Sequence, residues 1–245
     1  MTLTRPRRVT TDHWETADGE RLRSGLERLS STMHASAIPA LEHYARLLLK
    51  WNQTYNLLGA TTKAALIDDH LLDSLTVITP LERWLAPVSG LLHDVGSGAG
   101  LPGVPIAIAR PDWPLILIEP VGKKAAFMRQ VTAECRLTNV RIIEGRIETL
   151  ATPAAGDPPR HFICRAFTTL DRFASHCALH QSRHSLLFAM KSIRVTEELN
   201  TLPPSVRLLA HETLPPATPG TCRSLVIMTS ADGYADNRST DWPSS

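Results

Sequence analysis

The chain has no long hydrophobic run, few cysteines and few aromatic residues. Its longest apolar stretches, such as residues 115–118, are far shorter than the roughly 20 residues that a membrane helix needs. The first fifteen residues are basic, but no apolar segment follows them, so no secretory signal is predicted. Hydrophobic residues still make up 43% of the 245 residues. A soluble globular protein with a full core is therefore expected.

The cysteines and histidines predict no metal site. The four cysteines are widely spaced and form no CxxC pair, which argues against a zinc site and against a disulfide scaffold. We expect reduced thiols in a cytoplasmic protein. His176, His180 and His184 have the spacing i, i+4, i+8, but no carboxylate or thiolate partner accompanies them. We interpret them as a solvated surface.

The polarity of the chain divides it into three parts. Residues 1–35 are polar and weakly patterned, and a flexible segment is expected there. Residues 36–230 are predicted to form a single domain. Within it, the apolar residues of 38–58 recur at i, i+3, i+4 and i+7, which predicts an amphipathic helix. A second helical stretch covers 63–75, and Pro80 is expected to close this helical region. Residues 231–245 are polar and expected to be disordered.

From residue 90 onward, short apolar runs alternate with helical patterns. The runs predicted to be strands are 91–95, 115–119, 140–145, 161–166, 185–191, 206–214 and 224–230. Helical patterns cover 121–136 and 170–180. This alternation predicts an α/β fold with a mostly parallel, seven-stranded sheet. The last two runs are separated by a segment rich in proline and glycine, which predicts an antiparallel pair at the end of the sheet.

The strongest local signal is the segment HDVGSGAGLPG at 93–103. Gly96, Gly98 and Gly100 follow a predicted strand directly, where glycine lets the backbone approach a ligand closely. The spacing suits S-adenosylmethionine enzymes, but Gly98, Gly100 and Gly103 also fit the GxGxxG pattern of dinucleotide-binding proteins. Glu119 ends the next strand, where a carboxylate can accept both ribose hydroxyls of either cofactor. Both cofactor classes remain open at this point.

Several missing motifs narrow the choice of reaction. None of the three tyrosines is followed four residues later by a lysine, which argues against a short-chain dehydrogenase. The sequence also has no phosphate-binding GxxxxGK[ST] loop and no G-x-S-x-G nucleophile turn. The net charge is only +2, yet residues 120–196 contain twelve Lys/Arg and five Asp/Glu. This excess is explained about equally well by a site that holds a nucleic-acid phosphate backbone and by charges scattered over a solvated surface.

Five segments together resemble one known family. They are 51–57 (WNQTYNL), 70–75 (HLLDSL), 94–103 (DVGSGAGLPG), 165–167 (RAF) and 189–191 (AMK). In this order they resemble the RsmG family, also called GidB, of small-subunit ribosomal RNA guanine-N7 methyltransferases. The resemblance implies a Rossmann-like class I methyltransferase fold preceded by N-terminal helices, with S-adenosylmethionine as cofactor. It also implies a target in 16S rRNA or the small ribosomal subunit, usually N7 of guanosine 527.

The resemblance also assigns site residues. The residues expected to bind the cofactor are Gly96, Gly98, Gly100, Leu101, Glu119, Ile147, Glu148 and Arg165, of which the resemblance assigns Gly96, Leu101, Ile147, Glu148 and Arg165. Within this set, Ile147 and Glu148 would flank the adenine. Separately from the resemblance, the excess of positive charge over 120–196 makes Lys123, Lys124, Lys191 and Arg194 the candidate RNA contacts. No catalytic base is required, because guanine N7 already carries a lone pair; Arg165 and Lys191 are candidate positioning residues.

Three departures from the family pattern and two other functions stay open. Pro120 and Ser192 stand where the family usually has serine and glycine, and the loop at 151–160 is rich in Pro, Ala and Gly and slightly long. A NAD(P)-type oxidoreductase is the first alternative, and a non-catalytic RNA-binding domain is the second. The glycine loop and Glu119 argue against loss of cofactor binding. Calorimetry with S-adenosylhomocysteine and with NAD separates the three.

Overall fold

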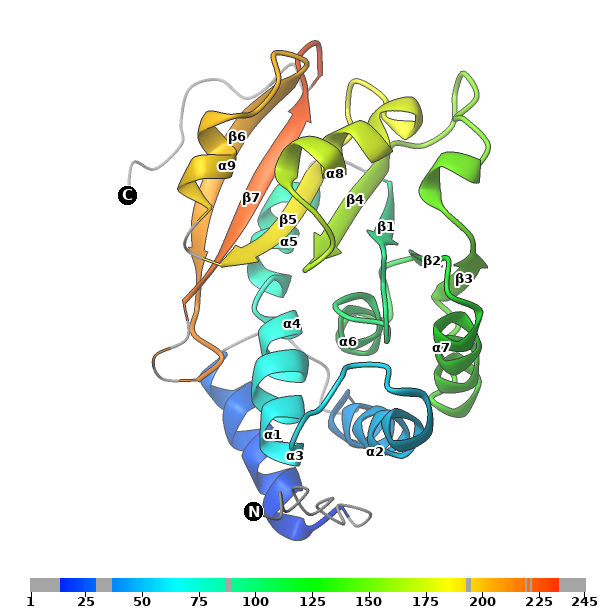
Figure 1. Ribbon diagram of the computed structural model, residues 1–245, viewed down its shortest axis with the longest axis vertical. Coiled ribbons are helices and arrows are strands. Elements are labelled where there is room, and N and C mark those ends of the chain that lie inside the picture. Colours follow the sequence, from blue (N-terminus) through cyan, green and yellow to red (C-terminus); the bar gives the residue numbers. More distant parts are fainter. Residues whose placement is uncertain are drawn as a thin grey trace, which may run out of the picture.

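The computed structural model describes residues 14–29, 37–86, 90–192, 195–218, 220 and 222–233. Within them, one seven-stranded sheet has the order β3-β2-β1-β4-β5-β7-β6 (Figure 1). The strands are β1 (Leu91–Val95), β2 (Leu115–Glu119), β3 (Val140–Glu144), β4 (Arg160–Arg165), β5 (Leu187–Ser192), β6 (Val206–Leu214) and β7 (Arg223–Ser230). All neighbouring pairs from β3 to β5 are parallel, and β7 is antiparallel to β5 and β6. The predicted sheet and its antiparallel last pair are confirmed.

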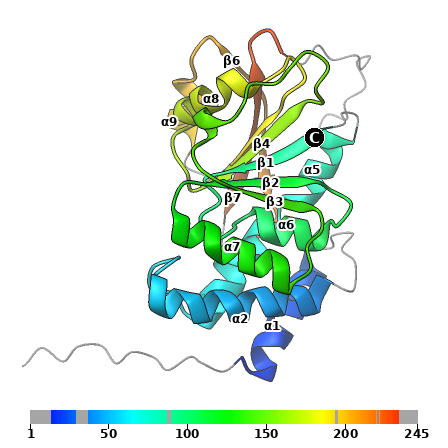
Figure 2. The same ribbon diagram turned by 90° about the vertical axis from the view of Figure 1, so that its right-hand side faces the viewer.

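The central strands are apolar because helices cover both faces of the sheet. Figure 2 shows α6 (Gly103–Ala109), α7 (Gly122–Glu134) and α5 (Ile78–Leu85) on one side, with α2 (Ala37–Tyr55) outside them. On the other side lie α8 (Leu170–Cys177) and the short α9 (Thr196–Asn200). Parallel strands end at the same edge of a sheet, so the loops that follow β1, β2, β3 and β4 come together there.

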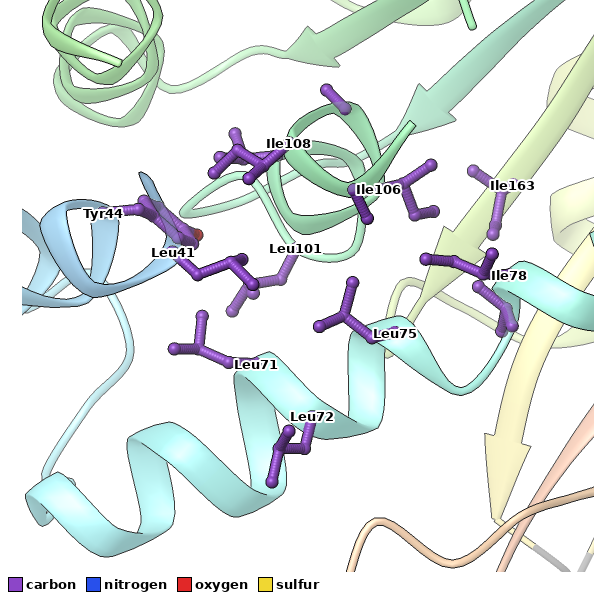
Figure 3. Packing of buried hydrophobic residues seen from close by; sticks show 14 of the residues in the cluster. Leu41, Tyr44, Leu71, Leu72, Leu75, Ile78, Leu101, Ile106, Ile108 and Ile163 are labelled. Carbon is purple, nitrogen blue, oxygen red and sulfur yellow. The ribbon is translucent and has the colours of Figure 1, made fainter. Parts of the chain in front are cut away.

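The N-terminal helices and the sheet share one hydrophobic core. Figure 3 shows Leu41 and Tyr44 of α2 packed with Leu71, Leu75 and Leu101. A second cluster, on the opposite face of the sheet, includes Phe173 of α8 and Ile147. The helices before β1 are therefore packed onto the sheet as an additional layer.

The predicted helical stretch at 63–75 is confirmed, but Pro80 does not close the region. The stretch consists of α3 (Lys63–Ala65), a π-helix η1 (Leu66–Leu72) and α4 (Asp73–Leu75). Pro80 lies in the first turn of α5. A proline is tolerated there because the amides of the first turn have no intrahelical carbonyl partner.

The expectation of a flexible segment over 1–35 is wrong for its middle part. Helix α1 (Thr16–Arg28) buries Leu22 and Leu26, and Arg21 forms an ion pair with Asp68 of η1. A Cβ atom on Gly25 would lie 2.1 Å from a methyl group of Leu72, so this glycine allows the two helices to approach. Residues 1–13 and 30–36 lie outside the described residues, and so does the part of the predicted disordered tail (231–245) from residue 234 onward.

Two further expectations concern histidines and membranes. His180 is buried, in a 3-10 turn after α8, so the solvated surface predicted for the three histidines is wrong at this position. Burial lowers the pKa of His180. In the part of the chain that the structure describes, no group of His, Cys, Asp or Glu side chains is arranged to hold a metal ion. None of the described helices is long and apolar enough to cross a membrane.

Candidate active site

The three glycines after β1 serve different purposes. Gly96, Gly98 and Gly100 have φ values of 72°, 60° and 91°, which favour glycine over residues with a side chain. A Cβ atom on Gly96 would lie 2.3 Å from the Phe167 ring, and one on Gly100 would lie 2.5 Å from Val104. At Gly98 the only neighbour within 4 Å would be the Gly96 carbonyl oxygen, at 3.9 Å. The loop therefore faces open space at Gly98, where a ligand can approach its backbone.

Asp94 holds this loop from inside the fold. Its Oδ2 atom accepts a hydrogen bond from the Gly103 amide at 2.9 Å, and a Cβ on Gly103 would lie 2.6 Å from the same oxygen. Its Oδ1 atom is buried and has no partner among the described residues. Burial raises the pKa of Asp94 to about 7. The sequence placed this acid in the glycine motif but did not single it out as a site residue.

Glu119 connects the glycine loop with the end of β2. Its Oε2 atom accepts from the Gly98 amide at 2.8 Å, and its Oε1 atom accepts from the Val121 amide at 2.9 Å. Each carboxylate oxygen has a second lone pair, which can accept from a ligand hydroxyl. The carboxylate thus lies where a ribose bound over Gly98 would need it, and that contact stays a prediction.

Beside the loop is a pocket of about 240 Å³. Its lining residues come from the ends of β1 to β4 and from α8: Val95, Gly96, Ile118, Pro120, Gly145, Arg146, Ile147, Glu148, Phe167, Thr168 and His176. The structure therefore brings Gly96, Ile147 and Glu148 together, as expected for a cofactor site. The open backbone at Gly98, the Glu119 carboxylate and the partly apolar pocket beside the loop fit a nucleoside-bearing cofactor.

One wall of this pocket is a histidine–carboxylate contact that the sequence did not predict. His176 of α8 contacts Glu148 through Nδ1, and its ring centroid lies 5.6 Å from that of Phe167. A backbone amide and His176 together lower the pKa of Glu148. Helix α8 thus fixes the residue expected to flank the adenine.

Leu101 is placed differently from the other loop residues. Its side chain is buried in the core that Figure 3 shows, between Leu41 of α2 and Leu71 of η1. Any contact of Leu101 with a ligand therefore comes from its backbone. The same core holds Tyr44, whose hydroxyl donates to the Ala99 carbonyl oxygen. Sequence reasoning used Tyr44 only as part of an apolar stripe.

Arg165, at the end of β4, points toward the N-terminal helical layer. Its Nε atom lies 2.9 Å from Asp73 Oδ2, and its Nη2 atom donates to the Asp69 carbonyl oxygen. The Nη2 atom also lies 3.4 Å from Nδ1 of His70. Burial lowers the pKa of Arg165, and burial followed by the charge of Arg165 lowers the pKa of His70. The HLLDSL and RAF segments are thus brought together by the fold.

Asp73 also binds a second arginine, Arg223, which begins β7. Arg223 Nε donates to Asp73 Oδ1 at 3.1 Å. Sequence reasoning missed Arg223, because nothing in its local pattern marks the first residue of a strand as part of a site. Arg223 is brought to Asp73 only when β7 pairs with β5.

The candidate RNA-binding lysines do not form one patch. Lys123 begins α7 and donates to the Tyr55 carbonyl oxygen at 2.8 Å; Lys124 follows it. Lys191 lies in β5 and donates to Thr168 at 2.6 Å and to Glu198 at 2.7 Å. Arg194 lies outside the described residues. Lys191 is therefore held between Thr168 and Glu198, whereas Lys123 contacts the end of α2.

Comparison with solved structures shows the fold. The chain is similar to the METTL16 methyltransferase domain, with a TM-score of 0.53 and 13% identity over 87% of this chain and 92% of that one. It is equally similar to the O-methyltransferase TomG from Streptomyces achromogenes, with a TM-score of 0.53 and 14% identity over 86% and 98%. These likenesses confirm the predicted class I methyltransferase fold.

Comparison of sequences shows the family. The chain is 39% identical over 217 residues to the ribosomal RNA small subunit methyltransferase G of Nitrosomonas eutropha, covering 85% of this chain and 96% of that one. It is 35% identical to the protein of the same name from Polynucleobacter asymbioticus, covering 84% and 92%. Residues 37–225 match the family described as GidB, rRNA small subunit methyltransferase G. The chain belongs to this family, as its five motifs indicated.

Proposed function

We propose that this protein transfers a methyl group from S-adenosylmethionine to N7 of a guanine in 16S rRNA. The observation that carries the proposal is the match to the methyltransferase G family over residues 37–225, because it includes the whole glycine loop and the pocket beside it. S-adenosylmethionine supplies an electrophilic methyl group on a positively charged sulfur. The protein chain itself must bind the acceptor and align it with this methyl group.

The residues around Gly98 suit the nucleoside part of that cofactor. The open backbone at Gly98 permits close approach, and Glu119 offers acceptors for the ribose hydroxyls. Ile147 and Glu148 line the neighbouring pocket, where we place the adenine. Leu101 contributes through its backbone. Because Asp94 orders the loop before any ligand binds, the loop loses less conformational entropy on binding.

Methylation at guanine N7 needs no strong base, because the attacking nitrogen carries a lone pair. Alignment of the acceptor with the methyl group and exclusion of water can supply most of the rate enhancement. The buried Arg165, fixed by Asp73, and Lys191, fixed by Glu198, are rigid positive groups at the edge of the site. We assign them positioning roles. They hold the loop after β4 and lower the local negative potential around the RNA.

We place the acceptor in 16S rRNA or the small ribosomal subunit, and hence the reaction in the cytoplasm. The exposed Lys123 and the half-buried Lys124 at the start of α7 are our candidates for phosphate contacts outside the pocket, together with Arg194. Replacing Lys123 and Lys124 by Ala should weaken RNA binding and reduce its salt dependence. Affinity for S-adenosylhomocysteine should change less than twofold. We further propose that residues 36–230 act as one catalytic domain, to which α1 adds a stabilising helix.

Mass spectrometry of 16S rRNA tests the proposal. Small subunits that lack the modification are incubated with S-adenosylmethionine and the protein, and their nucleosides are analysed for 7-methylguanosine. The proposal predicts one new 7-methylguanosine per 16S rRNA. Calorimetry with S-adenosylhomocysteine and NAD distinguishes the other functions: binding of NAD alone indicates an oxidoreductase, and binding of neither indicates a non-catalytic RNA-binding domain.

A further inference from the structure

A second pocket, of about 210 Å³, lies on the other side of the loop after β4. Its lining residues are Asp73, Arg165, Ala166, Met190, Lys191, Ser192 and Arg223. Among the described residues it shares none with the pocket beside the glycine loop. Ala166 lines this pocket and Phe167 lines the other, and Ala166 has the left-handed φ of 50°. The loop is therefore a wall between two separate binding spaces.

Three cations line the second pocket, and in two of them every side-chain nitrogen has a partner. Arg165 contacts the Asp73 carboxylate, the Ser74 hydroxyl and the Asp69 carbonyl oxygen, which all belong to the helical stretch at 63–75. Lys191 is bound by Thr168 and Glu198. Arg223 differs. Only its Nε atom is bound, to Asp73, and within the described part of the chain its two terminal nitrogens have no hydrogen-bond partner.

Asp73 determines where the free edge of Arg223 lies. The carboxylate is 3% exposed, and each of its oxygens lies within 3.1 Å of the Nε atom of a different arginine. It therefore neutralises part of the repulsion between Arg165 and Arg223 and holds the Nε edge of Arg223. The side chain of Arg223 remains 40% exposed, so its terminal nitrogens are accessible from solvent.

We propose that this pocket binds a backbone phosphate of the acceptor RNA through the terminal nitrogens of Arg223, with Asp73 as their positioning residue. This inference rests on the proposed function. The planar guanidinium presents parallel N–H groups that match two phosphate oxygens. One edge is fixed beforehand by Asp73, so little side-chain entropy is lost when the other edge binds.

The chemistry of guanine favours a phosphate over the base as the ligand of Arg223. An arginine normally reads guanine at O6 and N7, but N7 must face the methyl group in this reaction. The other edge of guanine carries N–H donors, which an arginine cannot accept. A carboxylate of the cofactor offers the same anionic oxygens as a phosphate. The loop at 165–167 separates Arg223 from the pocket beside Gly96, which is why we assign the RNA phosphate.

Binding of deproteinised 16S rRNA to Arg223→Gln, measured over a range of salt concentrations, tests the inference. We expect the dissociation constant to rise about tenfold and the slope against log salt to fall by roughly 0.7–0.9, the value for one phosphate. Arg183→Gln is the matched control. It removes the same charge from the turn before β5, at the opposite end of the strands, and should change the dissociation constant less than twofold.

Two further variants separate charge from geometry. Arg223→Lys keeps the charge but not the fork, so RNA affinity should recover to within about threefold of wild type while kcat stays at least fivefold lower. Asp73→Asn should lower kcat in the same way, because Arg223 is then no longer held. Thermal unfolding of each variant confirms that the fold persists.

Three results would overturn the inference. They are an unchanged salt slope in Arg223→Gln, an equal loss of affinity in Arg183→Gln, and a tenfold loss of S-adenosylhomocysteine affinity without a change in RNA affinity. The last would assign Arg223 to the cofactor carboxylate. Failure of the proposed function is distinct: wild-type protein would then produce no 7-methylguanosine, whatever Arg223 contributes to RNA binding.

Discussion

The hydroxyl group of Tyr44 donates a hydrogen bond to the carbonyl oxygen of Ala99 at 2.7 Å, with both residues buried. Tyr44 belongs to α2, and Ala99 lies in the glycine loop, 55 residues further along the chain. The contact connects the N-terminal helical layer directly to the loop that faces the cofactor. Burial raises the pKa of Tyr44 well above its usual value, so the hydroxyl remains a donor.

Tyr44→Phe should therefore weaken both the fold and the loop. Loss of the donor leaves a buried carbonyl oxygen unpaired, which costs about 1–3 kcal/mol of stability. We expect a lower free energy of unfolding in urea and a three- to tenfold weaker affinity for S-adenosylhomocysteine. Tyr55→Phe, at an exposed tyrosine of the same helix, is the control. Wild-type ligand affinity in Tyr44→Phe would show that the loop does not depend on α2.

Gly98→Val should abolish cofactor binding while the fold persists. A side chain at this position would point into open space, so it would block the ligand and not the core. The left-handed backbone adds a cost of roughly 1–2 kcal/mol. Gly156→Val shares that cost, because Gly156 has a φ of 94° and open surroundings away from the site. Calorimetry should show no binding to Gly98→Val and normal binding to Gly156→Val; equal affinities would place the cofactor elsewhere.

Glu119→Ala should weaken S-adenosylhomocysteine binding by about 1–3 kcal/mol, because ribose hydroxyls and the Gly98 amide lose their acceptor. Its neighbour in the sheet register provides the control. Glu144 ends β3 directly opposite Glu119, but it is exposed and paired with Arg129. Glu144→Ala should leave the affinity within twofold of wild type. If both variants bind equally well, the carboxylate of Glu119 does not contact the ligand.

Asp94 should make stability depend on pH. Burial raises its pKa from 3.8 to about 7, so the folded state keeps a proton that the unfolded state releases above about pH 4. The free energy of unfolding therefore falls as the pH rises from about 4 to 7, and the full loss is present above pH 7. Asp94→Asn, which keeps an acceptor for the Gly103 amide, should remove this dependence. Urea unfolding of both proteins at several pH values checks it, and parallel pH profiles would contradict the shifted pKa.

All seven strands, four of the helical stretches and the glycine loop were predictable from the sequence. The alternation of apolar runs and helical patterns predicted the parallel sheet. A strand that is apolar throughout must be covered on both faces, and the helices between the strands of a parallel sheet provide that cover. The glycines and Glu119 were readable because their roles are local: they concern backbone angles and the end of a strand. The five motifs together indicated the family before any geometry was known.

Other features were decided only by the tertiary structure. Arg223 and Asp73 are 150 residues apart, and Tyr44 and Ala99 are 55 apart, so no local pattern joins them. Helix α1 was missed because it contains few apolar residues. The helix is stabilised by packing against Leu72, which Gly25 permits. Arg165 could be placed at a strand end, but its direction depended on Asp73. Pairing between distant charges depends on burial and on packing of whole elements, which local spacing does not encode.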